Sequence, residues 1–188
     1  MEIITENWLE EMLQLCQQKD VGMVGAKLYY PDDTIQHAGV VVGLGGVAAH
    51  VLCKLPRDAE GYMGRLRCVQ EISAVTAACM MVKTSVFKAV GGFDEELKVA
   101  FNDIDLCMKV RKYGVKIVFT PYAELYHYES KSRGMEDTPE KQLRFSREVN
   151  YFRRKWEREL LKGDPYYNPN LTLNNTDCSL RKQEKNGD

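Results

Sequence analysis

The chain has 188 residues, 44% of them hydrophobic and 28% charged, a composition typical of one folded domain of ordinary size. Its 26 basic and 27 acidic side chains leave a formal net charge of −1, which argues against a nucleic-acid binder and against a polybasic membrane anchor. No apolar run reaches the ~18 residues that span a bilayer, and residues 1–20 are too polar for a signal peptide. The six cysteines form no Cys-x-x-Cys pair, which indicates reduced thiols. We therefore expect a cytoplasmic protein, with the inner face of the membrane as a second location.

Hydrophobic periodicity predicts helices and strands in mixed order. The expected helices cover residues 6–19, 84–91, 102–113 and 139–161, and the expected strands cover 21–30, 35–42, 72–82, 115–119 and 123–128. This mixture indicates an α/β or α+β domain. The chain opens with a lone helix instead of a β-α-β unit, so we expect its sheet to lack strands of a complete nucleotide-binding enzyme. We place the domain at residues 1–165 and an extended or disordered polar tail at 166–188.

A glycine-rich segment and three histidines leave alternatives open. Residues 43–46 read Gly-Leu-Gly-Gly after an apolar strand, but Ala48 occupies the third position of a Gly-x-Gly-x-x-Gly loop, so we expect a hairpin turn. His37, His50 and His127 lie on separate predicted strands. They either converge on a metal ion or have structural roles, and their spacing does not decide between the two.

Two carboxylates lie at the predicted start of the helix over residues 102–113. A helix N-terminus favours negative charge, so both residues fit a capping role. Helical spacing places Asp103 on one face with the apolar Leu106 and Val110, which predicts that it points to the interior edge. Asp105 aligns with Lys109 on a face that we expect to meet water. Asp103 is thus either a buried cap or a general base that accepts the proton of an attacking hydroxyl.

Six short peptides, taken in order, carry a resemblance to a known family. They are Val-Gly-Ala-Lys-Leu-Tyr (24–29), Ile-Gln-His-Ala-Gly (35–39), Ala-Val-Thr-Ala-Ala-Cys (74–79), Val-Gly-Gly-Phe-Asp-Glu (90–95), Phe-Asn-Asp-Ile-Asp-Leu (101–106) and His-Tyr-Glu-Ser (127–130). Their order and spacing resemble the C-terminal half of bacterial family 2 glycosyltransferases. The resemblance implies an α/β fold in which an incomplete GT-A-like mixed sheet is flanked by helices, with a long C-terminal helix.

The resemblance also implies an activity. Family members transfer a sugar from a nucleotide-diphosphate sugar to a hydroxyl of a glycan acceptor with inversion, and a divalent metal steadies the leaving diphosphate. Asp103 matches the catalytic base of the family. Asn102 stands where many relatives have Glu, which leaves the base intact. The resemblance places Asn102, Thr76, Ala77 and His37 among the substrate-binding residues.

His127 matches a family histidine that ligates the metal or contacts the diphosphate, and Lys131 and Arg133 match a loop that pairs with phosphate oxygens. The family's Asp-x-Asp metal motif and nucleotide-binding half have no counterpart in the sequence. A lone histidine holds Mg²⁺ or Mn²⁺ poorly, so we expect a divalent metal in a full enzyme and none with certainty in this chain.

Two further expectations follow from the missing half, and two alternative functions stay open. The isolated chain should not transfer sugar, and an open sheet edge should favour self-association. A non-catalytic binding module built on the same scaffold is the alternative function. A metal-dependent hydrolase that uses Asp103, Asp105 and the histidines ranks below both, because no His-x-x-x-His ligand motif is present.

Overall fold

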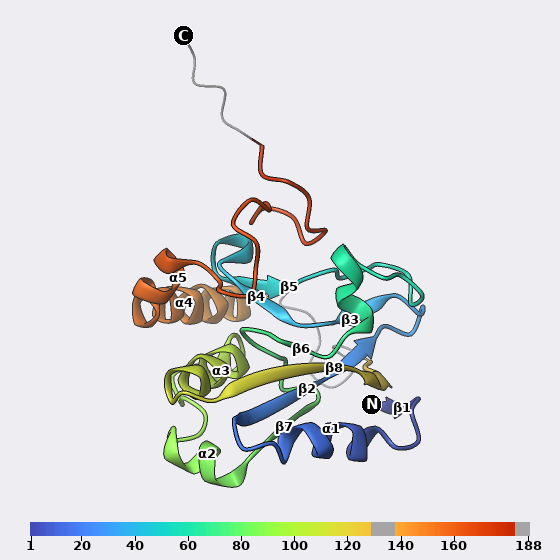
Figure 1. The fold of residues 1–188 in the computed structure, drawn as a ribbon. Coiled ribbons are helices and arrows are strands. Elements are labelled where there is room, and N and C mark those ends of the chain that lie inside the picture. Colours follow the sequence, from blue (N-terminus) through green and yellow to red (C-terminus); the bar gives the residue numbers. More distant parts are fainter. Residues whose placement is uncertain (129–137, 183–188) are drawn as a thin grey trace.

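The computed structural model describes residues 1–128 and 138–182. It contains one six-stranded mixed sheet, a two-stranded sheet above it, and helices on both sides (Figure 1). The strands are β1 (Glu2–Ile3), β2 (Val21–Tyr29), β3 (Ile35–His37), β4 (Val40–Val42), β5 (Ala48–His50), β6 (Gln70–Glu71), β7 (Met80–Val82) and β8 (Lys116–Tyr126). The helices are α1 (Trp8–Cys16), α2 (Thr84–Ala89), α3 (Asn102–Lys112), α4 (Pro139–Lys155) and α5 (Glu157–Lys162), with short 3-10 turns η1 (Leu44–Gly46) and η2 (Tyr62–Arg67). This arrangement confirms the predicted mixed α/β fold.

The long strands β2 and β8 run parallel at the centre of the large sheet. Every residue of β2 is buried. Its two faces contribute to separate apolar clusters: Met23 and Tyr29 join the larger one beneath β4, α3 and α4, whereas Val24 and Leu28 pack over α1. A strand buried on both faces explains the near-continuous apolar run in its sequence.

β8 is one strand, whereas the sequence predicted two strands that end and begin on either side of Pro121. Gly25 pairs with Phe119 and Lys27 pairs with Glu124, so the four residues 120–123 of β8 form a bulge opposite Ala26. A proline is tolerated in a bulge because no ladder hydrogen bond is required of its nitrogen. One bent strand therefore replaces the expected pair.

The predicted strands over 35–42 and 72–82 are also shorter than expected. Gly39, with φ +106, separates β3 from β4, and these two strands join different sheets. The turn at 43–46 connects β4 and β5 as an antiparallel hairpin, which confirms the expected hairpin turn. Of residues 72–82 only β7 is a strand.

β7 forms one edge of the large sheet. Cys79 O accepts from Ala26 N (3.4 Å), and Lys83 N donates to Gly22 O (3.0 Å), so alternate residues of β7 bond to β2. The backbone groups of Met80 and Val82 consequently face away from β2. Within the described residues no further strand pairs with this edge.

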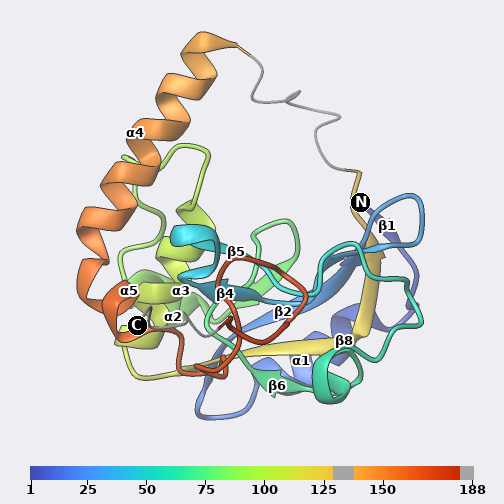
Figure 2. The same cartoon turned by 90° about the horizontal axis from the view of Figure 1, so that it is seen from above.

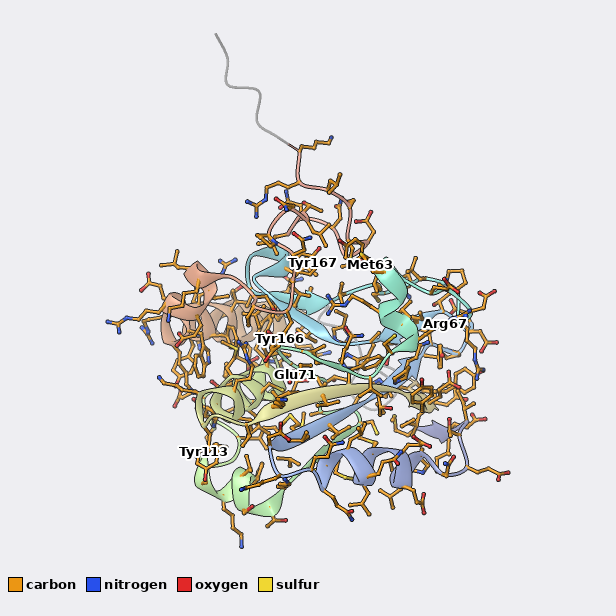
Figure 3. The ribbon with its side chains drawn as sticks, viewed as in Figure 1. Met63, Arg67, Glu71, Tyr113, Tyr166 and Tyr167 are labelled. Atoms are coloured by element: carbon orange, nitrogen blue, oxygen red, sulfur yellow. The ribbon has the colours of Figure 1, made fainter. Side chains whose placement is uncertain are left out.

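The C-terminal segment crosses the upper face of the domain (Figures 1 and 2). Residues 163–182 contain no helix or extended ladder, but Tyr167, Leu171 and Cys178 are buried in the main core. Figure 3 shows Tyr166, at the start of this segment, near Glu71. The expectation of a loose tail does not account for these contacts. In the described residues no helix is both long and apolar enough to cross a bilayer.

Candidate active site

The turn that begins α3 has a conformation that the sequence does not reveal. Phe101 precedes the helix with φ +61, in the left-handed region that is costly for a bulky side chain. Its ring lies 5.3 Å from the ring of Phe152 and 6.0 Å from that of Phe145, between centroids, and both belong to α4. These contacts offset the backbone cost and fix the direction in which α3 leaves the turn.

Glu148 of α4 holds the same turn through the backbone. Its side chain is 3% exposed, and its two carboxylate oxygens accept from Lys98 N (3.1 Å) and Ala100 N (2.8 Å). A buried carboxylate that accepts two backbone N–H groups makes strong, charge-assisted hydrogen bonds. α4 therefore sets the path of the chain directly before the two residues that the sequence predicts as functional.

Asp103 lies in the first turn of α3 and is half-buried. Its Oδ1 accepts from Ile104 N (2.9 Å), and its Oδ2 accepts from Ala77 N (3.0 Å). The side chain of Asn102 accepts from Asp103 N (2.7 Å). The carboxylate thus has a fixed orientation, bridges α3 to the segment before β7, and still reaches the surface.

The histidine pair lies behind that segment. Thr76 N donates to His37 Nε2 (3.4 Å), and His37 Nδ1 lies 3.2 Å from His50 Nδ1. Burial, and then the neighbouring His50, lower the pKa of His37 well below its usual 6.5. A neutral His37 that accepts at Nε2 carries its proton on Nδ1. His37 is completely buried, so it supports the wall of the site and does not face a ligand in this conformation.

A cavity of about 320 Å³ opens beside Thr76 and His50. It is lined by Tyr30, Gln36, Ala49, His50, Cys53, Thr76, His127 and Thr176. His127 Nδ1 lies 2.7 Å from Gln36 Oε1, and Gln36 Nε2 donates to the carbonyl of His127 (3.2 Å). The structure therefore brings Thr76 and His127 to one cavity, with Asp103 one residue away through its bond to Ala77.

Asp105 corrects a prediction from helical spacing. We expected it to face water, but its side chain is 0% exposed. The expected pair with Lys109 is present at 3.4 Å between Nζ and Oδ2. Two more groups surround the Asp105 carboxylate. Lys155, the last residue of α4, contacts Oδ1 through Nζ (2.7 Å), and Trp156, which follows it, donates from Nε1 to the same oxygen (2.8 Å). α4 covers this face of α3, so the face is buried.

The residues present do not fit a divalent metal on their own. Among residues 1–128 and 138–182, no group of three or more His, Cys, Asp or Glu side chains comes together in a ligating arrangement. Mg²⁺ and Mn²⁺ prefer several oxygen ligands, which His127 with its Gln36 neighbour does not supply. The predicted Lys131 and Arg133 lie outside the described residues.

Comparison with known proteins decides the family. The model described as "Glycosyltransferase like family 2" matches residues 2–147. The chain belongs to this family. It is 58% identical to the uncharacterized protein y4gI of Sinorhizobium fredii over 96% of the chain and 20% of that protein. It is 39% identical to the O-antigen biosynthesis protein RfbC of Myxococcus xanthus over 100% of the chain and 14% of that protein.

A third relative is similar over a shorter stretch. The N-acetylglucosaminyl-diphospho-decaprenol L-rhamnosyltransferase of Mycobacterium tuberculosis is 36% identical over 33% of the chain and 20% of that protein. The matched stretches cover a fifth or less of the length of each of these three curated relatives. Family membership and the mixed sheet flanked by helices together give the chain a GT-A-like fold.

Proposed function

We propose that the chain forms the acceptor-side part of a glycosyltransferase of polysaccharide synthesis, with Asp103 as the catalytic base. The observation that carries this proposal is the geometry of Asp103. Its carboxylate lies at the N-terminus of α3, accepts two backbone N–H groups, and borders the segment that lines the His127 cavity. The family and the role named in RfbC support the substrate class.

In the proposed reaction an acceptor hydroxyl attacks the anomeric carbon of a nucleotide-diphosphate sugar from the face opposite the leaving group. The hydroxyl proton passes to an oxygen of Asp103 as the new C–O bond forms. The bond from the anomeric carbon to the diphosphate oxygen breaks, and the nucleotide diphosphate leaves with that electron pair. A single displacement inverts the anomeric configuration. Thr76 and His127 are the described neighbours from which the acceptor would receive hydrogen bonds.

In family members a divalent metal would supply positive charge beside the departing diphosphate. The described residues hold no complete set of ligands for it, so no step is assigned to a metal here. His127 remains the described side chain placed to contribute one nitrogen or a hydrogen bond to the diphosphate. The proposal for Asp103 does not depend on which of these two roles His127 has.

The base is tested by Asp103→Asn, which keeps the shape of the side chain and removes its basicity. Sugar transfer is measured with the longest natural polypeptide that contains these residues and with residues 1–188 alone. Loss of a general base should lower kcat by about 10²–10⁴-fold with little change in donor KM. Asp20→Asn removes an exposed carboxylate that pairs with Lys116 and serves as the matched control. A rate for Asp103→Asn within tenfold of the unchanged protein would refute the assignment.

Residues 1–188 alone are expected to be inactive, because the described residues hold no complete metal site. Turnover by this segment alone would mean that a complete donor site lies within it. If no polypeptide length transfers sugar from any nucleotide sugar tested, the non-catalytic binding module becomes the better explanation.

A further inference from the structure

A second hollow, of about 640 Å³, opens where β2 and β8 approach the turn after β2. It is lined by Lys27, Tyr29, Asp32, Asp33, Thr34, Pro56, Arg57, Asp58, Ala59, Arg67 and Glu124. Its floor is the central sheet, and its outer wall includes η2, on which Figure 3 shows Arg67 at the outer side. We call this hollow the β2–η2 bowl. It shares no described lining residue with the cavity that contains His127.

Lys27 at the floor is an unusual residue for a strand interior. Its side chain is buried, with only 5% of the residue exposed, and burial lowers the pKa of its ammonium group. Nζ donates to Leu66 O (3.2 Å) and lies 5.4 Å from the centroid of the Tyr29 ring. An ammonium group has three N–H donors, and within the described residues one of them meets an acceptor. Lys27 lines the bowl, where a ligand oxygen would satisfy the remaining donors.

Arg57, Asp33, Glu124 and Tyr29 of the bowl contact one another. Arg57 reaches Glu124 (3.3 Å) and Asp33 (3.4 Å), and its guanidinium carbon lies 4.9 Å from the centroid of the Tyr29 ring. The hydroxyl of Tyr29 donates to Glu124. Because these side chains hold each other in place, the donors and acceptors are preorganised, which lowers the cost of ordering them around a ligand.

The charge balance of the bowl selects the class of ligand. The lining contains four carboxylates and three cations. The carboxylates are Asp32, Asp33, Asp58 and Glu124, and the cations are Lys27, Arg57 and Arg67. The carboxylates disfavour a phosphate or carboxylate ligand, and the cations disfavour an amine. A neutral ligand with several hydroxyls fits both signs, because each hydroxyl donates one hydrogen bond and accepts others. The volume lies within the usual range for small-molecule sites, about 300–1,000 Å³.

We propose that the β2–η2 bowl binds a neutral saccharide, with Lys27 donating to one hydroxyl and the exposed Asp58 accepting from another. The saccharide class follows from the lining alone. That this saccharide is a unit of the acceptor, distant from the reacting hydroxyl, rests on the proposed function. In that role the bowl would hold a neighbouring sugar unit while Asp103 acts on the terminal one.

The test measures binding and not turnover, so it can fail without affecting the case for Asp103, and the reverse also holds. The chain is labelled with ¹⁵N and titrated with D-glucose, D-galactose, L-rhamnose and D-glucuronate. We expect saturable shifts of the backbone amides of Thr34 and Ala59 with at least one neutral sugar. D-Glucuronate should bind more weakly than D-glucose. Absence of shifts at the bowl with all three neutral sugars, or tighter binding of D-glucuronate, would overturn the proposal.

Lys27→Met keeps an unbranched apolar stem and removes the donors, and it should weaken sugar binding about tenfold or more. Lys83→Met is the matched control, because Lys83 also donates to a single backbone carbonyl, Gln18 O at 2.6 Å, but lies outside the bowl. If Lys27→Met does not fold, Asp58→Asn at the exposed rim replaces it, with a smaller loss expected. An unchanged dissociation constant in a folded variant would show that the bowl is not the binding site.

Discussion

The buried carboxylate of Asp105 gives the sharpest test of how α4 is attached to α3. It is completely buried and contacts Lys155 Nζ (2.7 Å), Trp156 Nε1 (2.8 Å) and Lys109 Nζ (3.4 Å). Asp105→Asn keeps the shape but removes the charge that neutralises two ammonium groups. Removing one partner of a buried ion pair costs about 3–5 kcal/mol. Lys155 keeps Asp94 and its side chain is 28% exposed, so we expect the low end, about 3 kcal/mol.

Urea unfolding followed by circular dichroism measures this loss, and a thermal melt should show Tm lower by about 6–12 °C for a chain of this size. Asp20→Asn is the control. Its ion pair with Lys116 has 59% and 45% exposed side chains, so solvent screens it and its loss should change stability little. If Asp105→Asn costs no more than Asp20→Asn, the carboxylate does not pair with Lys155 in solution and α4 is attached by apolar packing alone.

Two other outcomes test the histidine pair and the sheet edge. Burial holds the pKa of His37 well below 6.5 in the folded protein, so the unfolded chain binds a proton at this residue more readily. The neutral His37 therefore contributes stability above about pH 6.5. This contribution is lost as the pH falls, by up to about 1.4 kcal/mol per pH unit. The free energy of unfolding should therefore decrease below that pH, and His37→Gln should flatten the curve; identical pH profiles would contradict a neutral buried His37. At the β7 edge we expect concentration-dependent self-association in sedimentation velocity, because strand edges with free backbone groups pair with other copies. Val82→Pro removes an N–H that faces away from β2 and leaves the ladder to β2 intact, so it should lower the association. If the unchanged chain is a monomer at high concentration, the prediction is wrong.

The sequence predicts the elements whose burial pattern is local. α1, α3 and α4 each carry an apolar stripe, and α1 and α3 form within three residues of their predicted ends. The single helix predicted over 139–161 is divided at Trp156 into α4 and α5. The sequence does not predict where contacts with distant residues interrupt an apolar run. Residues 72–82 have the apolar content of a strand, yet Ala74 bridges Val40, and Ala77 N bonds to Asp103, so both are drawn away from the ladder of β2.

The sequence likewise predicted some features of the candidate site and missed others. The resemblance predicts roles for Asp103, Thr76 and His127. In the structure Thr76 and His127 line one cavity, and Asp103 bonds to Ala77, the residue after Thr76. Spacing alone misplaced Asp105, because the groups that bury it come from α4, about fifty residues later in the sequence. Glu148 and the left-handed Phe101 carried no sequence signal of their role. Nothing local distinguishes a glutamate that accepts two distant backbone N–H groups from one on a solvated helix face.

The position of Asp103 therefore depends on α4 at three points. Glu148 fixes the backbone before the turn, Phe152 packs on Phe101 within it, and Lys155 neutralises Asp105 one turn beyond. These residues recur at intervals of four and three, so one face of α4 bears all three contacts. If Asp103 is the base proposed above, substitutions on this face should lower turnover without entering the site, because a displaced base costs rate even when every ligand contact is kept. Asp103 and the helix that positions it are separated along the chain by β8 and the segment after it.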